Sequence, residues 1–285
     1  MNNAFLVRPT ICVWTARKID KKATKEATSH AGASAKAGVK VYKSVIAADA
    51  LDKVASIAGA ARIEHRKRTA PWSYEGVGAI TTEGYQPYKD AMAKYQSEFR
   101  SAVSKFLSVY ETEREAARSY LGGMFNSNDY PTPSSLAQKF SFTLHVEPIP
   151  EASTFQADLP PEQVSEIRRD IIASNTTALQ NANTNAWGRV LEKVELLKTR
   201  LQEYSNGEVT KFYDSWIDNI KELVSFIPSI NVANDPDLKA MGRKLMVLTA
   251  YSAADLKESV ALRNEVVKQA QTVLDGISEA YKSAA

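Results

Sequence analysis

Cysteine and histidine are scarce in this chain of 285 residues, which has one cysteine and three histidines. The single cysteine, Cys12, excludes an intramolecular disulfide and fits a reducing compartment. It falls in a predicted strand among apolar neighbours, so we expect a buried structural thiol and not a nucleophile. His30, His65 and His145 form no pair at the spacing of metal ligands. The sequence therefore predicts no metal site.

Motifs of nucleotide-using enzymes are also missing. The stretch GASAKAG at 32–38 lacks the glycine-lysine-hydroxyl ending of a phosphate-binding loop. GVG at 76–78 is not the longer glycine fingerprint that opens a helix after a strand. The acidic residues Glu111, Glu113 and Glu115 alternate along a predicted helix, so they spread around it and do not converge. We therefore predict a non-enzymatic protein without a cofactor.

Long apolar runs are absent as well. No segment approaches the roughly 20 apolar residues that span a membrane. The first residues, MNNAFLVRPTICVW, lack the basic and apolar regions of a signal peptide. We expect a cytoplasmic protein with no membrane partner.

Positive charge is concentrated in the first quarter of the chain. Residues 1–70 contain 14 Lys or Arg and 5 Asp or Glu, a net charge of +9, although the whole chain carries only +3. Residues 71–150 and 151–285 are mildly acidic, at −2 and −4. This asymmetry favours a polyanionic partner for one end, and a solvated lysine-rich segment without a ligand is the alternative.

Residue spacing predicts an α+β first half. Residues 7–17 and 140–146 have the β-branched or alternating composition of strands, and we expect them to pair in a small antiparallel sheet. Apolar residues recur at spacings of three and four over 88–120, which predicts a long helix packed on that sheet. A shorter helix is predicted over 47–63. The Ala- and Lys-rich segment 20–40 indicates a mobile basic loop or a weak helix.

Prolines between 148 and 161 mark a predicted linker. We therefore place a basic α+β domain at 1–150 and a helical bundle or docking domain at 157–285. Asp235, which precedes a proline, and Ser252, a plausible N-cap, indicate the starts of two of its helices. The predicted fold class is α+β, mainly α: a small antiparallel sheet with a long helix, followed by a helical bundle.

The densest basic stretch is the candidate binding site. Clustered cations attract phosphates, and exposed aromatic rings stack on bases, a combination typical of single-stranded nucleic-acid binding. Pro71 argues against a helix running through this stretch. Instead of stacking on a base, Trp72 has the alternative function of anchoring the loop in the core. The candidate residues are His65, Arg66, Lys67, Arg68, Trp72 and Tyr74, extended by Arg17, Lys18, Lys21 and Lys22 if these lie alongside.

Residues 11–159 also resemble a known family as an ordered pattern. ICVWTARK, AARIEHRKRTAPW, EFRSAVSKFLSVYE and KFSFTLHVEPIP resemble an uncharacterised phage and bacterial family, the domain of unknown function numbered 3150. Its members tend to occur near MoxR-type AAA+ ATPases or among phage DNA-metabolism genes. The resemblance implies an accessory function, and host cytoplasm if the protein is phage-encoded. It assigns no catalytic residue.

These observations lead to one leading hypothesis and two alternatives. The leading hypothesis is a non-enzymatic phage accessory protein of DNA metabolism that binds single-stranded nucleic acid through the basic N-terminal surface and self-associates through its helical half. An adaptor that docks on an AAA+ ATPase or a host protein through the helical half is the first alternative. A structural component of the virion is the second.

Overall fold

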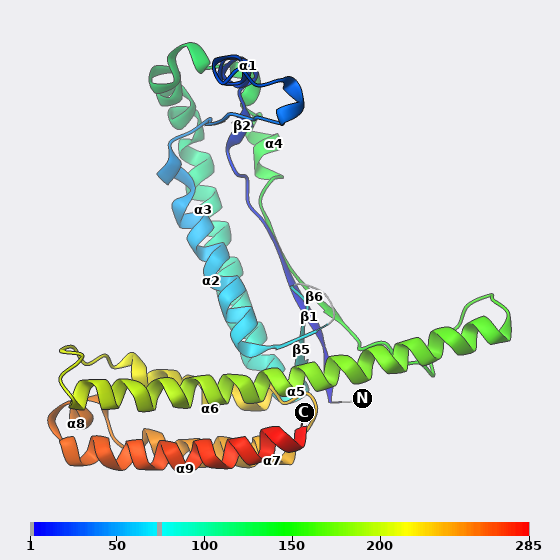
Figure 1. Ribbon diagram of the computed structural model, residues 1–285. Helices are drawn as coiled ribbons and strands as arrows, with labels where there is room; N and C mark the ends of the chain where they lie inside the picture. Colours follow the sequence, from blue (N-terminus) through cyan, green and yellow to red (C-terminus); the bar gives the residue numbers. More distant parts are fainter. Residues whose placement is uncertain (1–2, 73–75, 285) are drawn as a thin grey trace. The chain divides into compact units, whose positions relative to one another are not determined.

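A computed structural model describes residues 3–72 and 76–284 of the chain (Figure 1). Helices dominate the described residues and accompany a small antiparallel sheet, so the predicted fold class is confirmed. No helix in this part of the chain is both long and apolar enough to cross a membrane. The helices are α1 (Lys21–His30), α2 (Asp52–Arg68), α3 (Thr82–Leu121), α4 (Pro133–Ala137), α5 (Pro161–Ser205), α6 (Ser215–Ile230), α7 (Pro236–Leu245), α8 (Ala253–Glu258) and α9 (Val260–Ala284). The strands are β1 (Ala4–Cys12), β2 (Arg17–Ile19), β3 (Tyr42–Ser44), β4 (Ala70–Pro71), β5 (Gly78–Thr81) and β6 (Ser141–Glu147).

The main sheet has the strand order β4-β5-β1-β6. β1 and β5 are antiparallel, with Ala4 opposite Thr81 and Val7 opposite Gly78. β1 and β6 are neighbours in this sheet and correspond to the strands predicted at 7–17 and 140–146. Their predicted pairing is confirmed.

Contacts divide the chain into two compact units. Unit 1 contains residues 1–8, 64–90 and 145–285, and unit 2 contains residues 9–63 and 91–144. The dividing points fall inside β1, α2, α3 and β6. This division differs from the predicted boundary in the proline-rich linker, because Ala4 and Ala79 of the sheet share a hydrophobic core with the helices that follow the linker.

The core of unit 2 lies between α2, α3 and the strand that follows them. The long helix predicted over 88–120 is confirmed as α3, which begins several residues earlier than predicted and ends before Gly122, a residue with a positive φ of 50°. Its aromatic side chains pack edge-on against those next to and in β6: Phe99 lies 5.9 Å from Phe142, and Phe106 lies 5.8 Å from Phe140, between ring centroids. The predicted packing of the long helix on the sheet is therefore confirmed.

The core of unit 1 is a helical bundle formed around α5. The buried side chains of α5 begin at Ala178 and include Trp187, whose indole N–H donates to Asp235 Oδ2 at 2.9 Å. Asp235 also caps α7, because its other carboxylate oxygen accepts the N–H of Leu238. Ser252 and Asp255 form a capping box at the start of α8. Both predicted helix starts are confirmed.

Two local predictions are wrong. α2 continues through the basic stretch to Arg68, because Pro71 lies beyond the helix and contributes instead to β4. Cys12 is exposed and not buried. In the second half of β1 the even-numbered residues Arg8, Thr10 and Cys12 lie on the exposed face, as the alternation of a strand requires.

Candidate nucleic-acid interface

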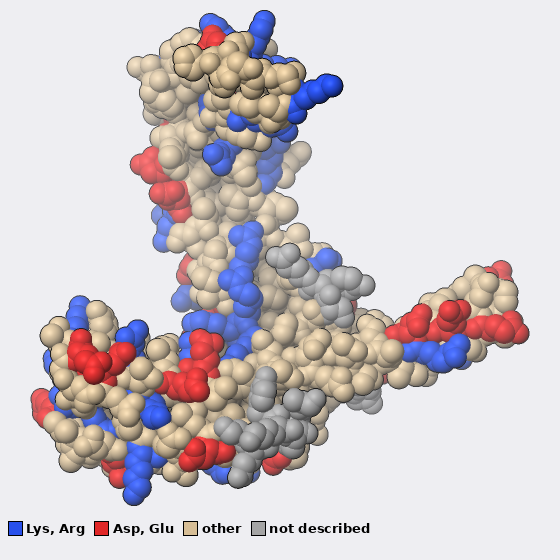
Figure 2. All heavy atoms as spheres, viewed as in Figure 1, with Lys and Arg blue, Asp and Glu red and all other residues tan. Residues whose placement is uncertain are grey.

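Unit 2 presents exposed cations on and around a two-stranded hairpin. β2 and β3 pair antiparallel, with Ile19 opposite Tyr42, and α1 lies between them in the sequence. Figure 2 shows Lys and Arg side chains projecting from the region of α1 and β2. We call these residues the hairpin cations: Arg17, Lys18, Lys21, Lys22, Lys25, Lys36 and Lys40.

Side-chain hydrogen bonds hold α1 against the hairpin, although α1 buries no side chain. Asp20 is the N-cap and accepts the N–H of Ala23 at 2.9 Å. This bond holds the pKa of Asp20 below its ordinary value. The hydroxyl of Thr24 accepts the N–H of Val41 at 3.0 Å, which ties the helix to the residue before β3. Of the two alternatives predicted for 20–40, the weak helix therefore forms.

A buried lysine fixes the hairpin from its inner side. Lys43 Nζ lies 2.9 Å from Asp129 Oδ2 and 3.3 Å from Asp20 Oδ2, and it also donates to the carbonyl oxygen of Met124. Burial alone would lower the pKa of Lys43, but the bonds to Asp129 and Asp20 outweigh it and raise the pKa. The charge of Lys43 is thus used internally, and Lys43 is not one of the exposed cations.

The outer side of the hairpin exposes an aromatic ring beside a cation. Because side chains alternate along a strand, Arg17 and Ile19 lie on the same face as Tyr42, opposite to the face of Lys43. The side chain of Tyr42 is 52% exposed, and the guanidinium of Arg17 lies 5.7 Å from its ring centroid. This face offers a base both a stacking surface and an adjacent positive charge.

The hairpin cations are not neutralised by neighbouring carboxylates. None of them forms an ion pair with another described residue. Residues 13–45 contain eight Lys or Arg and two Asp or Glu, and one of those two is Asp20, which is paired with Lys43. Only Glu26 opposes the hairpin cations within this segment, so the hairpin surface has a strongly positive potential.

The basic stretch at the end of α2, in unit 1, is arranged differently. His65 is only 4% exposed, and its Nδ1 lies 2.9 Å from the hydroxyl of Tyr88. Burial lowers the pKa of His65 to about 4, so its ring is uncharged at neutral pH. The prediction that His65 contacts nucleic acid is therefore wrong: the helix continues through this position and turns the ring into the core.

The other cations of this stretch are largely engaged within unit 1. Lys67 forms an ion pair with Glu222 of α6, with Nζ 2.8 Å from Oε1. Arg68 is half-buried and paired with Glu64 one helical turn earlier. Arg66 is exposed and has no ion-pair partner among the residues that the structure describes. Among the described residues, Arg66 is thus the one cation of this stretch whose charge is not paired with a carboxylate.

Of the two predicted aromatic residues, the structure describes Trp72, which belongs to unit 1. Trp72 is half-buried and packs against the core of unit 1, which supports its alternative function as an anchor. Its backbone N–H donates to the carbonyl oxygen of Val77 at 3.2 Å. Tyr74 lies outside the described residues, so its place in the site stays a prediction.

The structure therefore brings together four of the predicted residues, Arg17, Lys18, Lys21 and Lys22, and assigns the described remainder to the other unit. Sequence reasoning missed Tyr42, Lys36 and Lys40. The sequence did contain a sign of this site: the short alternating stretch VYKS at 41–44 includes an aromatic residue and follows Lys40. Exposure of Tyr42 depends on which face of the hairpin Lys43 occupies, and composition does not specify that face.

Comparison with known proteins adds no identification: no family model, curated protein or solved structure matches this chain. The resemblance to the uncharacterised phage and bacterial family stays a prediction. Within residues 3–72 and 76–284, no group of three or more His, Cys, Asp or Glu side chains is placed to hold a metal ion.

Proposed function

We propose that this protein binds single-stranded nucleic acid, without catalysing a reaction on it, through the hairpin cations and Tyr42. The observation that carries the proposal is the group of seven exposed cations, none of them ion-paired with another described residue, in the same segment as the exposed ring of Tyr42. Binding by such a surface depends on salt, because each phosphate contact releases counterions. An accessory function in phage DNA metabolism is the setting that the family resemblance suggests.

Two features favour a single strand over a duplex. Bases in a duplex are stacked on one another, whereas those of a single strand are free to stack on an exposed ring such as Tyr42. The hairpin cations also lie on short strands, a short helix and the residues between them, and not on a long recognition helix that would fill a major groove. The phosphates of a flexible strand can follow cations that lie on several short elements.

The test is a fluorescence-anisotropy titration of a labelled single-stranded oligonucleotide at several salt concentrations. We compare the wild type with Lys18→Glu/Lys21→Glu/Lys22→Glu and with a control of equal charge change in unit 1, Lys244→Glu/Lys257→Glu/Lys268→Glu. If the three hairpin lysines contact phosphates, the slope of log K against log salt decreases in magnitude by about 2. The control keeps the wild-type slope. Equal loss in both variants, or no binding by the folded wild type at low salt, would contradict the proposal.

Tyr42→Ala separates stacking from charge. Removing a ring that stacks on one base costs about 1–3 kcal/mol, which is at least a fivefold loss of affinity, without changing the salt slope. The control is Tyr213→Ala, because Tyr213 is comparably exposed, at 46%, but lies in unit 1. Unchanged affinity in Tyr42→Ala would remove the ring from the proposed site.

A second candidate function, docking of a partner protein through the helical half, is favoured by the first part of α5. No α5 side chain before Ala178 is buried, and Ile172 is 57% exposed. Figure 1 shows this part of α5 continuing beyond α6 and α9 of the same unit. We expect Ile172→Glu to weaken self-association or partner capture, measured by light scattering and pull-down, whereas Gln180→Glu on the same helix does not. Identical behaviour of both variants would contradict docking through this segment.

A further inference from the structure

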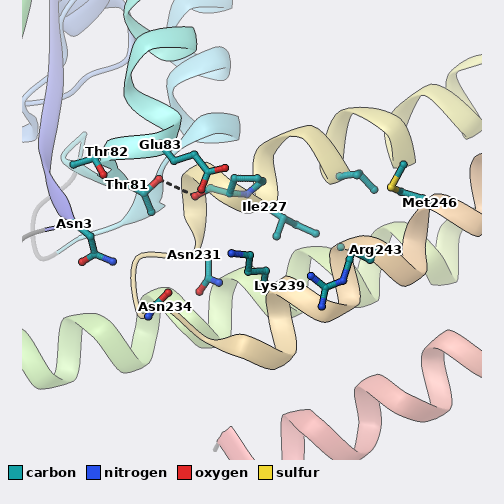
Figure 3. Close-up of a pocket in the computed structure, with 13 residues that line it drawn as sticks. Asn3, Thr81, Thr82, Glu83, Ile227, Asn231, Asn234, Lys239, Arg243 and Met246 are labelled. Carbon is teal, nitrogen blue, oxygen red and sulfur yellow. Dashed lines mark hydrogen bonds between the residues drawn. The ribbon is translucent and has the colours of Figure 1, made fainter.

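A cavity of about 320 Å³ lies within unit 1, beside the first turn of α3 and between α6 and α7 (Figure 3). It is separate from the hairpin surface, which belongs to unit 2. Cavities that bind small molecules measure about 300–1,000 Å³. This one is at the lower end of that range, so it can hold a ligand of about the size of one amino-acid residue.

The cavity is bordered on one side by close contacts of β5 and α3 with α6, and on the other side by a glycine of α7. The hydroxyl of Thr81 donates to the carbonyl oxygen of Pro228 at 2.7 Å, and Gly84 approaches Ser229 too closely to permit a side chain. On α7, Gly242 faces Ile227 and leaves unfilled the space that a larger residue would occupy. These contacts place the start of α3 over a hollow between two helices.

The floor of the cavity is apolar and its two walls carry opposite charges. Val224, Ile227 and Met246 supply apolar surface. Lys239 and Arg243 stand four residues apart on α7 and therefore on one face of that helix. Glu83 reaches the cavity from α3, on the opposite side in Figure 3.

The charged groups of the walls are available to a ligand. Lys239, Arg243 and Glu83 form no ion pair with any residue described in the structure. Thr81 and Asn231, by contrast, are committed: Thr81 bonds to Pro228, and the amide of Asn231 bonds to the backbone of Asp235 in both directions. Ionic recognition therefore depends on the two cations and one carboxylate.

We propose that this cavity binds a small apolar monocarboxylate whose neighbouring atom carries an N–H, the chemistry of an N-acylated apolar amino acid. The carboxylate is held by Lys239 and Arg243, the apolar side chain covers Ile227 and Met246, and Glu83 accepts the N–H. Two cations and one carboxylate leave one net positive charge on the walls, which matches a monoanion better than a doubly charged phosphate. The inference goes beyond nucleic-acid binding and does not depend on it.

The same chemistry occurs in a free metabolite and at the C-terminus of a peptide, so the test has an arm for each source. Binding to the full chain is measured by titration calorimetry and saturation-transfer NMR with N-acetyl-L-phenylalanine, its C-terminal amide and phenyl phosphate. A short neutral peptide that ends in phenylalanine is compared with the same peptide extended by two glycines. Tight binding of the first peptide, lost on extension, identifies a peptide terminus; binding of the free acid alone identifies a small molecule.

The expected results follow from the geometry. The carboxylate binds at least about tenfold more tightly than the amide, because charge-assisted hydrogen bonds to Lys239 and Arg243 are lost in the amide. Lys239→Gln/Arg243→Gln weakens the carboxylate to the level of the amide. Lys244→Gln, an exposed lysine on α7 that does not line the cavity, leaves binding unchanged. Equal binding of the acid and the amide, or tighter binding of phenyl phosphate than of the acid, would overturn the proposal. So would a Lys244→Gln variant that binds as weakly as the double variant. Absence of binding by both the acid and the peptide at millimolar concentration would also overturn it.

Discussion

Replacement of Gly84 by alanine tests the contact between α3 and α6 directly. A Cβ atom at position 84 would lie 2.3 Å from Oγ, 2.4 Å from Cβ and 2.5 Å from Cα of Ser229. Favourable contact between carbon atoms needs about 3.5–4.0 Å, so the two helices must separate by about 1 Å or more. The backbone Cα atom is among the atoms in conflict, and a rotamer change of Ser229 therefore cannot relieve it.

The magnitude follows from three effects. Overpacking of a well-packed site costs about 1–3 kcal/mol, and this contact is near the upper end because backbone must move. Separation of the helices also breaks the bond from Thr81 to Pro228, which contributes about 1 kcal/mol. In the opposite direction, alanine stabilises a helix relative to glycine by up to about 1 kcal/mol. We expect Gly84→Ala to lower the free energy of unfolding by about 3 kcal/mol.

The assay is urea denaturation of the full chain, followed by tryptophan fluorescence and far-UV circular dichroism. Trp187 is fully buried in the bundle and reports on that unit. Gly188→Ala is the matched control, because a Cβ there meets no atom within 4 Å, and we expect it to stabilise the unit by up to about 1 kcal/mol. Adding Ser229→Gly to Gly84→Ala removes two of the three close atoms and should restore part of the loss. A Gly84→Ala protein within about 0.5 kcal/mol of wild type would refute the reasoning.

Two further predictions concern buried ionisable groups. Lys43→Met leaves Asp20 and Asp129 without their shared cation, so we expect unit 2 to lose about 1.5–3 kcal/mol in urea denaturation, and wild-type stability in this variant would contradict the packing of the hairpin. His65 has a folded-state pKa of about 4, below the ordinary 6.5, so its contribution to stability is complete above pH 6.5 and is lost as the pH falls towards 4. This loss amounts to about 3 kcal/mol and should be absent in His65→Gln, and an NMR titration that placed the pKa of His65 near 6.5 would contradict its burial.

The sequence predicted those elements whose signal is local. α3 was predictable because its apolar residues repeat over many turns, and the β1–β6 pair because alternation is visible in β6. The exposure of His65 was predicted wrongly because its hydrogen-bond partner, Tyr88, is 23 positions away in the sequence. The residues of the basic stretch give no local sign that one side of the helix is buried. Tyr42 and Lys43 are neighbours in the sequence, yet Tyr42 is 52% exposed and Lys43 only 9%. The register of the hairpin and the ion pair of Lys43 with Asp129 determine which of the two side chains faces inward, and neither is visible in the local sequence.

The division of unit 1 into three separate stretches has a consequence for biosynthesis. Ala4 and Leu6 of β1 share the core of the bundle with residues of α5 to α9, which are synthesised much later. At about 5–20 residues per second, β1 is synthesised on the order of ten seconds or more before α9, the last helix of the bundle. Such long sequence separations slow folding, because loop closure precedes the contacts that compensate for it. Ala4 and Leu6 therefore lack their bundle partners until α5–α9 have left the ribosome, and we expect chaperones that bind apolar nascent segments to act on the chain during that interval.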